Sequence, residues 1–158
     1  MEINMWINGK EFHGEVAPDT LLIDFVRSKG NFSVKRGCET SNCGLCTVPL
    51  EGKPVLSCST LVARADGKHV ITLEGIQKEA VQIGGFIADE GAEQCGFCSP
   101  GLIMNMYAMK NELNSPNDEE IRNYLSGNLC RCTGYMGHMR AIRSYLESAE
   151  EVNHEDRK

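Results

Sequence analysis

Eight cysteines are the residues of this chain whose number and spacing could support chemistry, and they form two sets of four among 158 residues. The first set has the spacing C-x4-C-x2-C, with a fourth cysteine after eleven more residues, and its members are Cys38, Cys43, Cys46 and Cys58. The second set is a C-x2-C pair and a C-x-C pair separated by 31 residues, and its members are Cys95, Cys98, Cys130 and Cys132. Each set could supply the four thiolates of a metal centre or a small iron–sulfur cluster.

The opening spacing of the first set is typical of plant-type [2Fe–2S] ferredoxins. Two irons joined by bridging sulfides need two thiolates each, so a tight loop can deliver three cysteines and a neighbouring element the fourth. Gly37 and Gly44 allow such a loop to wrap closely, and its backbone amides can then point at the sulfurs. The two sets therefore predict two [2Fe–2S] clusters, one in each half of the chain.

Disulfides, zinc and dithiol exchange are the alternatives that also use dense cysteines. Disulfides are disfavoured because the chain begins without a secretory signal, and zinc because neither set has the usual ribbon spacing. Dithiol exchange would explain only the two C-x2-C pairs. A Rieske cluster needs histidine ligands, and no histidine lies within three residues of a cysteine. We expect surface or turn positions for the four histidines: His13, His69, His138 and His154.

Composition and missing motifs narrow the function further. The net charge of −6 gives no reason to expect nucleic acid as a partner, and no apolar run is long enough to span a bilayer. Dense cysteine in a chain without a secretory signal indicates a reducing cytosol. Neither a G-x-G-x-x-G turn nor a phosphate-binding loop is present, and no nucleophile lies beside a base. Two clusters in a chain without a substrate site indicate an electron-transfer protein, which accepts electrons at one cluster and passes them through the other.

The elements that must hold the first set are strands and one helix, up to about residue 75. Alternating apolar residues predict strands over 3–7 and 12–16, joined by a hairpin turn at Asn8-Gly9. Asp19 or Thr20 is expected to cap a short helix that Lys29-Gly30-Asn31 ends. Cys-rich residues 34–46 are expected to form a loop. Further short strands are predicted over 47–50, 54–57 and 69–73.

After Glu74 the apolar period changes from two to about 3.6, which predicts about four helices. Ser99-Pro100 has the form of a capping hydroxyl followed by proline at the first helical position, so the amides there should favour the Cys98 thiolate. The C-x-C pair is expected in a turn between two helices. The expected helices are 79–89; one from Ser99 with Leu102, Met106, Met109 and Leu113 on one face; one opened by Asp118; and one carrying Met139, Ile142, Leu146 and Ala149. The polar tail Asn153–Lys158 is expected to fray.

Four segments together resemble the small iron–sulfur subunit of the molybdenum hydroxylases, the xanthine dehydrogenase/aldehyde oxidase family. They run from Val34 to Val48, over Leu73-Glu74-Gly75, from Gln94 to Gly101 and from Gly127 to Tyr135. The resemblance covers nearly the whole chain. It implies an α+β fold: a ferredoxin-like β-grasp domain over residues 1–75, then an all-α four-helix [2Fe–2S] domain over residues 76–158.

The resemblance also implies a non-catalytic electron-transfer subunit of a cytoplasmic enzyme, in a dimer of heterotrimers. A large subunit would carry the molybdopterin cofactor and the substrate, and a medium subunit would carry FAD. Electrons would pass from molybdenum through the cluster of the second set, then that of the first set, to FAD. Gln94 and Cys132 would contact the pterin, and Cys132 would also bind iron. A xanthine-type purine is the favoured substrate, with aldehydes, nicotinate, carbon monoxide or an aromatic thioester as alternatives.

Four positions depart from the family pattern. Ser41 and Asn42 stand where many members have glycines, so a positive φ at Ser41 would cost on the order of 1 kcal/mol. Leu45 replaces a residue that is commonly small, and we expect it either to crowd the cluster or to meet a partner. Ser99 replaces a threonine, which is a mild change because both can cap a helix.

Overall fold

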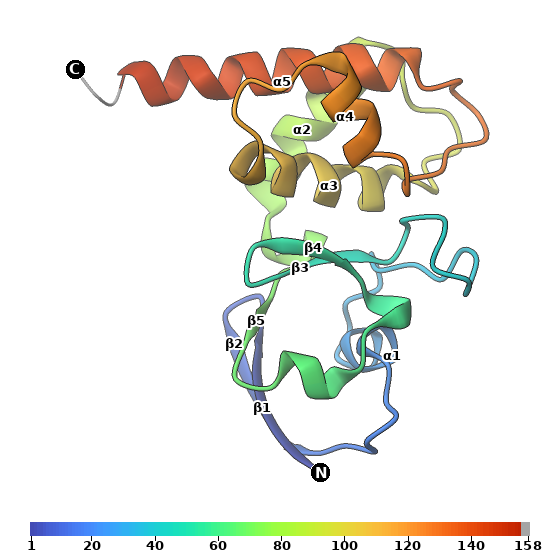
Figure 1. The fold of residues 1–158 in the computed structure, drawn as a ribbon, viewed down its shortest axis with the longest axis vertical. Helices are drawn as coiled ribbons and strands as arrows, with labels where there is room; N and C mark the ends of the chain where they lie inside the picture. Colours follow the sequence, from blue (N-terminus) through green and yellow to red (C-terminus); the bar gives the residue numbers. More distant parts are fainter. Residues whose placement is uncertain (156–158) are drawn as a thin grey trace.

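The computed structural model describes residues 1–155, with side chains described for residues 1–149. A five-stranded sheet with one helix forms one half of the molecule, and four helices form the other (Figure 1). The elements are β1 (Glu2–Ile7), β2 (Lys10–Glu15), α1 (Leu22–Ser28), β3 (Thr47–Leu50), β4 (Lys53–Leu56), β5 (His69–Val70), α2 (Gln77–Asp89), α3 (Ser99–Glu112), α4 (Asp118–Tyr124) and α5 (Met136–Glu155), with short 3₁₀ helices at Ser57–Ser59, Val62–Ala65 and Leu73–Gly75. No helix of the described chain is long and apolar enough to cross a membrane. The fold is α+β, as the sequence predicts.

The sheet has the strand order β2-β1-β5-β3-β4, in which β1 pairs in parallel with β5 and the other neighbours are antiparallel. The predicted hairpin is confirmed, because Ile7 pairs with Lys10 and both turn residues have positive φ, 52° at Asn8 and 77° at Gly9. That combination suits the right-handed twist of two short strands. The buried faces of β1 and α1 form one core with the interior residues of β3.

The helix α1 begins differently from the expectation. Its N-cap is Leu21, without a side-chain cap, so the prediction of a cap at Asp19 or Thr20 is wrong. The reason is that Leu21 forms an isolated β-bridge with Leu61, and the Leu22 amide donates to the Thr60 carbonyl at 2.7 Å. Partners distant in sequence thus satisfy the backbone that a capping hydroxyl would otherwise serve.

The strand expected over 69–73 is only two residues long. The chain leaves the sheet because the Thr72 amide donates to Asn8 Oδ1 at 2.8 Å instead of to a neighbouring strand. Glu74 then accepts hydrogen bonds from the amide and hydroxyl of Ser33 and from the Thr72 hydroxyl, at 2.6–2.8 Å. These contacts hold the segment that leads from β5 to α2 against the loop after α1.

The helical half contains the four helices expected from the apolar period, and α2 runs through Gly84-Gly85. The apolar face expected on α3 lies in the helical core, with Leu102, Met106 and Met109 buried and Leu113 partly buried. Ile103 and Met104 are buried as well, so α3 is covered on more than that one face. One side of α3 packs on α2 and α5, and another side packs on β3 and β4. This helix is therefore the joint between the two halves (Figure 1).

The helix termini also differ in detail from the sequence expectations. Ser99 is the first residue of α3 and not its cap, because the N-cap is Cys98 and the Ser99 hydroxyl donates to Glu93 at 2.8 Å. The helix that Asp118 opens is capped by Asn117, in a capping box with Glu120. The residues expected on the apolar face of α5 are all buried: Met139, Ile142, Leu146 and Ala149. Of the tail Asn153–Lys158 that was expected to fray, residues 153–155 belong to α5, and residues 156–158 lie outside the described residues.

Candidate iron–sulfur sites

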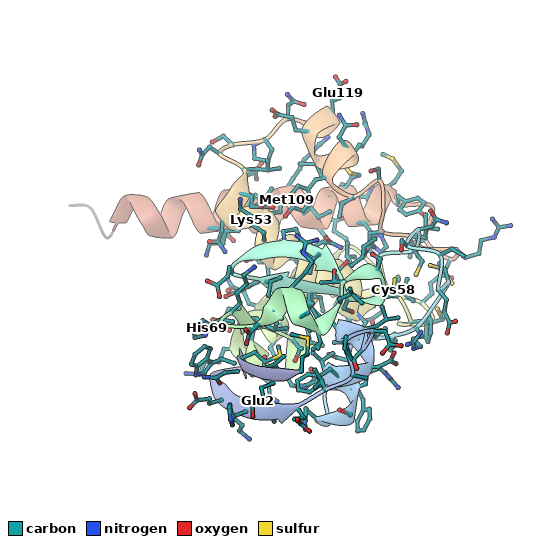
Figure 2. The ribbon with its side chains drawn as sticks, turned by 60° about the horizontal axis from the view of Figure 1, so that its bottom comes forward. Glu2, Lys53, Cys58, His69, Met109 and Glu119 are labelled. Atoms are coloured by element: carbon teal, nitrogen blue, oxygen red, sulfur yellow. The ribbon has the colours of Figure 1, made fainter. Side chains whose placement is uncertain are left out.

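The first cysteine set lies where the loop between α1 and β3 meets the 3₁₀ helix after β4. Cys43 and Cys46 are buried, whereas Cys38 and Cys58 are half-buried. Ser57 ties the two segments together, because its amide and its hydroxyl both donate to the Cys46 carbonyl, at 3.2 and 2.6 Å. Cys58 lies on the side of the molecule opposite the free end of α5 (Figure 2). The structure thus brings together the four cysteines that the sequence spacing assigns to the first set.

The backbone of this loop turns its amides toward a sulfur. The amides of Thr40 and Asn42 both lie 3.4 Å from Cys38 Sγ, and they lower the pKa of that thiol to about 6. Glu39 and Ser41 have positive φ, 56° and 61°, which produces the tight wrap. The positive φ that would strain Ser41 is therefore present, and its cost is on the order of 1 kcal/mol. Amides aimed at a thiolate are what a cluster loop needs.

Leu45 is buried within this chain, so little of its side chain is left for a partner to contact. A Cβ at Gly37 would lie 3.0 Å from the Leu45 side chain and 3.0 Å from Cys43 Sγ, so these three residues are tightly packed. The Leu45 carbonyl also accepts from the Lys35 amide at 3.2 Å. Of the two roles expected for Leu45, the structure favours crowding inside the loop.

The second cysteine set gathers at two helix junctions, as predicted. Cys95 and Cys98 precede α3, and Cys130 and Cys132 lie between α4 and α5. The Sγ atoms of Cys95 and Cys132 are 3.6 Å apart, and both residues are exposed. Cys98 is buried and Cys130 is half-buried, and their sulfurs lie within 4.8 Å of each other. The set therefore forms an outer pair and an inner pair.

The environment of the inner pair corrects one expectation. Burial and, after it, the adjacent Cys130 together raise the pKa of Cys98 to about 12, so the start of α3 does not favour the Cys98 thiolate in the chain alone. At Cys130, burial also acts to raise the pKa. Hydrogen bonds from the Thr133 hydroxyl and from nearby amides more than offset this, and the pKa is lowered. Iron would supply the positive charge that Cys98 lacks here.

His138 is a residue of this site that the sequence reasoning placed wrongly. It is buried, and a ring nitrogen lies within 4.8 Å of the sulfurs of Cys98 and Cys130. Its Nε2 lies 2.9 Å from the Ala92 carbonyl, which links α5 to the segment before Cys95. His13 and His69 are exposed as expected, whereas the side chain of His154 lies outside the described residues. The spacing of His138 from the cysteines gives no signal for it. Only the burial of residues at the start of α5 could have indicated that this histidine belongs to the site.

Gln94 and Cys132 lie together on the exposed side of the second set. The Gln94 side-chain amide donates to the Cys132 carbonyl at 3.1 Å, and both residues are exposed. Leu129, Tyr135 and Met136 are large apolar side chains that are also exposed, between 40% and 63%. Apolar surface of this kind around a polar centre is typical of an interface with another protein.

The loops that carry the two sets touch each other directly. The Leu129 amide donates to the Cys43 carbonyl at 2.8 Å. A Cβ at Gly44 would lie 2.3 Å from the Gly127 carbonyl oxygen, so only glycine permits this approach. The Lys35 ammonium, shortly before Cys38 in sequence, lies 4.6 Å from the ring of Phe97, which stands between Cys95 and Cys98. The two candidate centres are therefore neighbours in one rigid contact region.

The donor set fits iron–sulfur clusters. All eight cysteines are free thiols, which disagrees with a disulfide framework. Each set presents four sulfurs on two segments, and backbone amides or hydroxyls point at some of them. In the first set, the Cys43 thiol interacts with that of Cys38, and the Cys46 thiol with that of Cys58. Sulfurs in two pairs match the two thiolates per iron that a [2Fe–2S] centre requires, so the class of protein is a two-centre iron–sulfur protein.

Two family models match the chain, and their descriptions agree with this class. A 2Fe-2S iron-sulfur cluster binding domain matches residues 19–92, and a [2Fe-2S] binding domain matches residues 72–143. The xanthine dehydrogenase iron-sulfur-binding subunit of Escherichia coli O157:H7 is 45% identical over 140 residues, which are 84% of this chain and 86% of that one. The nicotinate dehydrogenase small FeS subunit of Eubacterium barkeri is 40% identical over 148 residues, 92% of this chain and 94% of that one.

Solved structures give the same answer. Quinoline 2-oxidoreductase from Pseudomonas putida 86 matches with a TM-score of 0.85 and 36% identity, over 96% of each chain. The aldehyde oxidoreductase of Desulfovibrio gigas matches with a TM-score of 0.84 and 34% identity, over 98% of this chain and 17% of that one. The chain belongs to the family of small iron–sulfur subunits of the molybdenum hydroxylases, and it is a non-catalytic electron-transfer subunit of an oxidoreductase.

Proposed function

We propose that this chain relays electrons through two [2Fe–2S] clusters between the molybdenum and flavin subunits of a molybdenum hydroxylase. The observation that carries the proposal is the pair of cysteine quartets, whose loops meet at the hydrogen bond from Leu129 to Cys43. The proposed ligands of the first cluster are Cys38, Cys43, Cys46 and Cys58. The proposed ligands of the second cluster are Cys95, Cys98, Cys130 and Cys132.

The sulfur pairs support a division of the ligands between irons. In the second set, Cys95 would share one iron with Cys132, because their sulfurs are 3.6 Å apart, and Cys98 would share the other with Cys130. In the first set the corresponding pairs are Cys38 with Cys43 and Cys46 with Cys58. When bound, each cluster supplies one-electron chemistry. The protein holds the ligands at fixed spacing, excludes water around the inner sulfurs and donates hydrogen bonds to them.

The fold supports a direction for the relay. The outer pair of the second set is exposed beside Gln94, so this centre would face the large subunit, with Gln94 and Cys132 in contact with the pterin. The first set would lie nearer FAD on the medium subunit. The strand order supports a β-grasp domain over residues 1–75, and the four helices support a separate [2Fe–2S] domain over residues 76–158. A dimer of heterotrimers in the cytoplasm remains a prediction.

For the whole complex we propose a xanthine-type purine as substrate. The support is the 45% identity to the xanthine dehydrogenase subunit of Escherichia coli O157:H7. The relative of Eubacterium barkeri is named for nicotinate, and a relative of Pseudomonas sp. is named for caffeine, at 36% identity. Nicotinate is therefore the main alternative, with aldehydes, carbon monoxide and aromatic thioesters behind it. Substrate oxidation by the purified complex, with xanthine compared against nicotinate, decides between them.

Metal analysis and electron paramagnetic resonance test the relay itself. The chain, purified without oxygen from cells supplied with iron, should contain about four irons and about four acid-labile sulfides. Its reduced form should give two distinct [2Fe–2S] signals. A colourless protein that contains zinc would replace this proposal with a zinc-stabilised structural module, because zinc sites do not absorb visible light. Purification without a large and a medium subunit, under mild conditions, would instead indicate a free-standing ferredoxin.

A further inference from the structure

Thr133 lies between the C-x-C pair and α5, and its hydroxyl donates a hydrogen bond to a proposed ligand. The distance from Thr133 Oγ1 to Cys130 Sγ is 3.2 Å, shorter than the 3.4 Å contacts of the two amides at Cys38. Thr133 is half-buried, whereas Thr40, in the loop of the first set, is exposed. Water therefore competes less for the Thr133 hydroxyl.

A closed ring of hydrogen bonds fixes the direction of this hydroxyl. The Tyr135 amide donates to Thr133 Oγ1 at 3.3 Å, so that oxygen acts as an acceptor there and its own hydrogen is left for the sulfur. The Cys130 amide in turn donates to the Tyr135 hydroxyl at 2.9 Å. Gly134 and Tyr135 both have positive φ, 67° and 69°, and this turn folds Tyr135 back over the C-x-C segment.

Physical chemistry indicates what such a contact does to an iron–sulfur centre. Reduction adds one negative charge, and part of that charge is shared by the thiolate ligands. A hydrogen bond to a thiolate stabilises the reduced form more than the oxidised form, and it thereby raises the reduction potential. Hydrogen bonds to charged groups are also stronger than neutral ones. Cys98 is buried and Cys130 is half-buried, so water screens the contact at Cys130 less than it would at an exposed sulfur.

We propose that Thr133 raises the reduction potential of the second cluster through its hydroxyl contact with Cys130 Sγ. Thr133 is a positioning residue in this role, since it acts through the cysteine. The inference rests on the proposed function, because it requires that the second set bind a [2Fe–2S] cluster. The reduction potential of the second cluster then depends on the Thr133 side chain as well as on the cysteine ligands.

The test compares Thr133→Val with the unaltered chain by redox titration of the two resonance signals. Valine keeps the shape of threonine and removes the hydroxyl. At a fixed potential near the midpoint, the ratio of reduced to oxidised second cluster should fall about tenfold, which for one electron corresponds to about 59 mV. The signal of the first cluster in the same sample should keep its midpoint. Thr133→Ser keeps a hydroxyl and should keep the second midpoint within a twofold change in that ratio.

Each outcome decides the inference. If Thr133→Val loads both clusters and the second midpoint does not move, or both midpoints move equally, the inference is overturned. If Thr133→Val does not load the second cluster, a brief exchange of the unaltered chain into D₂O decides. The hydroxyl hydrogen exchanges before protected amides, so hyperfine spectroscopy should find a rapidly exchanged deuteron coupled to the reduced second cluster. Absence of that deuteron overturns the inference, whereas absence of the cluster from the unaltered chain overturns the proposed function itself.

Discussion

The amide of Leu129 donates a hydrogen bond of 2.8 Å to the carbonyl of Cys43, and this contact joins the two cysteine loops. Leu129 immediately precedes Cys130, so the hydrogen bond connects the backbone of one proposed ligand to the residue beside another. A route between the two centres therefore runs through covalent bonds and one hydrogen bond, without a gap that water would fill. Around this contact, α3 packs the helical half of the molecule against β3 and β4 of the sheet half.

Because the two ligand sets are separate, a substitution in one set should remove the cluster of that set and leave the other. Cys43→Ser should remove the resonance signal of the first cluster and leave that of the second, because the remaining second-set sulfurs are unchanged. Cys98→Ser should do the reverse. Electron paramagnetic resonance and iron content, about two irons instead of about four, measure both effects. Loss of both signals from either folded variant would contradict the assignment of ligands to two independent sites.

The contact between the loops depends on the absence of a side chain at Gly44. Gly44→Ala would place Cβ 2.3 Å from the Gly127 carbonyl oxygen, at a φ of +74°, so both strain and overlap oppose it. We expect the free energy of unfolding to fall by at least ~2 kcal/mol. Gly85→Ala is the control, because Gly85 is an exposed residue of α2 with nothing near its Cβ position. That change should stabilise by ~0.5–1 kcal/mol, and denaturant unfolding of both variants checks the pair.

Two asparagines of α3 make similar backbone contacts but differ in burial. Asn105 is buried, and its amide donates to the carbonyl of Gly101 and to the side chain of Asn128. Asn105→Ala should leave Asn128 short of a partner and cost ~1–3 kcal/mol. The exposed Asn111 donates to the Tyr107 carbonyl at 3.3 Å, where water can replace its amide, so Asn111→Ala should change stability by less than ~0.5 kcal/mol. Equal effects in chemical denaturation would show that burial does not decide this difference.

Glu74 should make the stability of the sheet half depend on acid. Burial acts to raise the pKa of Glu74, but hydrogen bonds from Ser33 and Thr72 outweigh it, and the pKa is lowered. A lowered folded pKa gives stability that is present above the unfolded value, ~4.3, and is lost as the pH falls through the folded value. Glu74→Gln should therefore cost ~2 kcal/mol at pH 7, and the difference from the unaltered chain should shrink below pH ~4.

Unfolding curves at several pH values check this expectation. The control is Glu147→Gln, at an exposed position of α5, for which stability at pH 7 should change little. A cost for Glu74→Gln that stays constant down to pH 3 would mean that the ionised carboxylate is not what stabilises the segment before α2.

Local spacing was sufficient to group the cysteines as the structure groups them and to predict the division into a sheet half and a helical half, whereas the role of these cysteines as ligands stays a prediction. Motif spacing and apolar period are local properties, and they survive in the structure at Cys38–Cys46 and from α2 onward. The pairing of β1 with β5 was beyond such reasoning, because it joins segments more than 60 residues apart. Tertiary contacts with Thr60 and Leu61 likewise replaced the local cap expected for α1.

The wrong prediction for His138, beside the second set, has a similar cause. His138 reads as a polar residue near a turn, but the start of α5 packs on Ala92, and this contact buries the imidazole beside two sulfurs. Glycine at 137 permits that approach, since a Cβ there would lie 2.8 Å from the Ala92 side chain. Such burial depends on the start of α5 meeting the loop between α2 and α3, which a spacing within one segment does not encode.

Cys95 and Cys132 are exposed, whereas Cys98 is buried and Cys130 half-buried, and this difference has a practical consequence for handling the isolated subunit. Dissolved oxygen and peroxide can reach the outward-facing sulfurs without any opening of the fold. The centre built on them should therefore bleach first in air, and a covering protein surface should slow that damage.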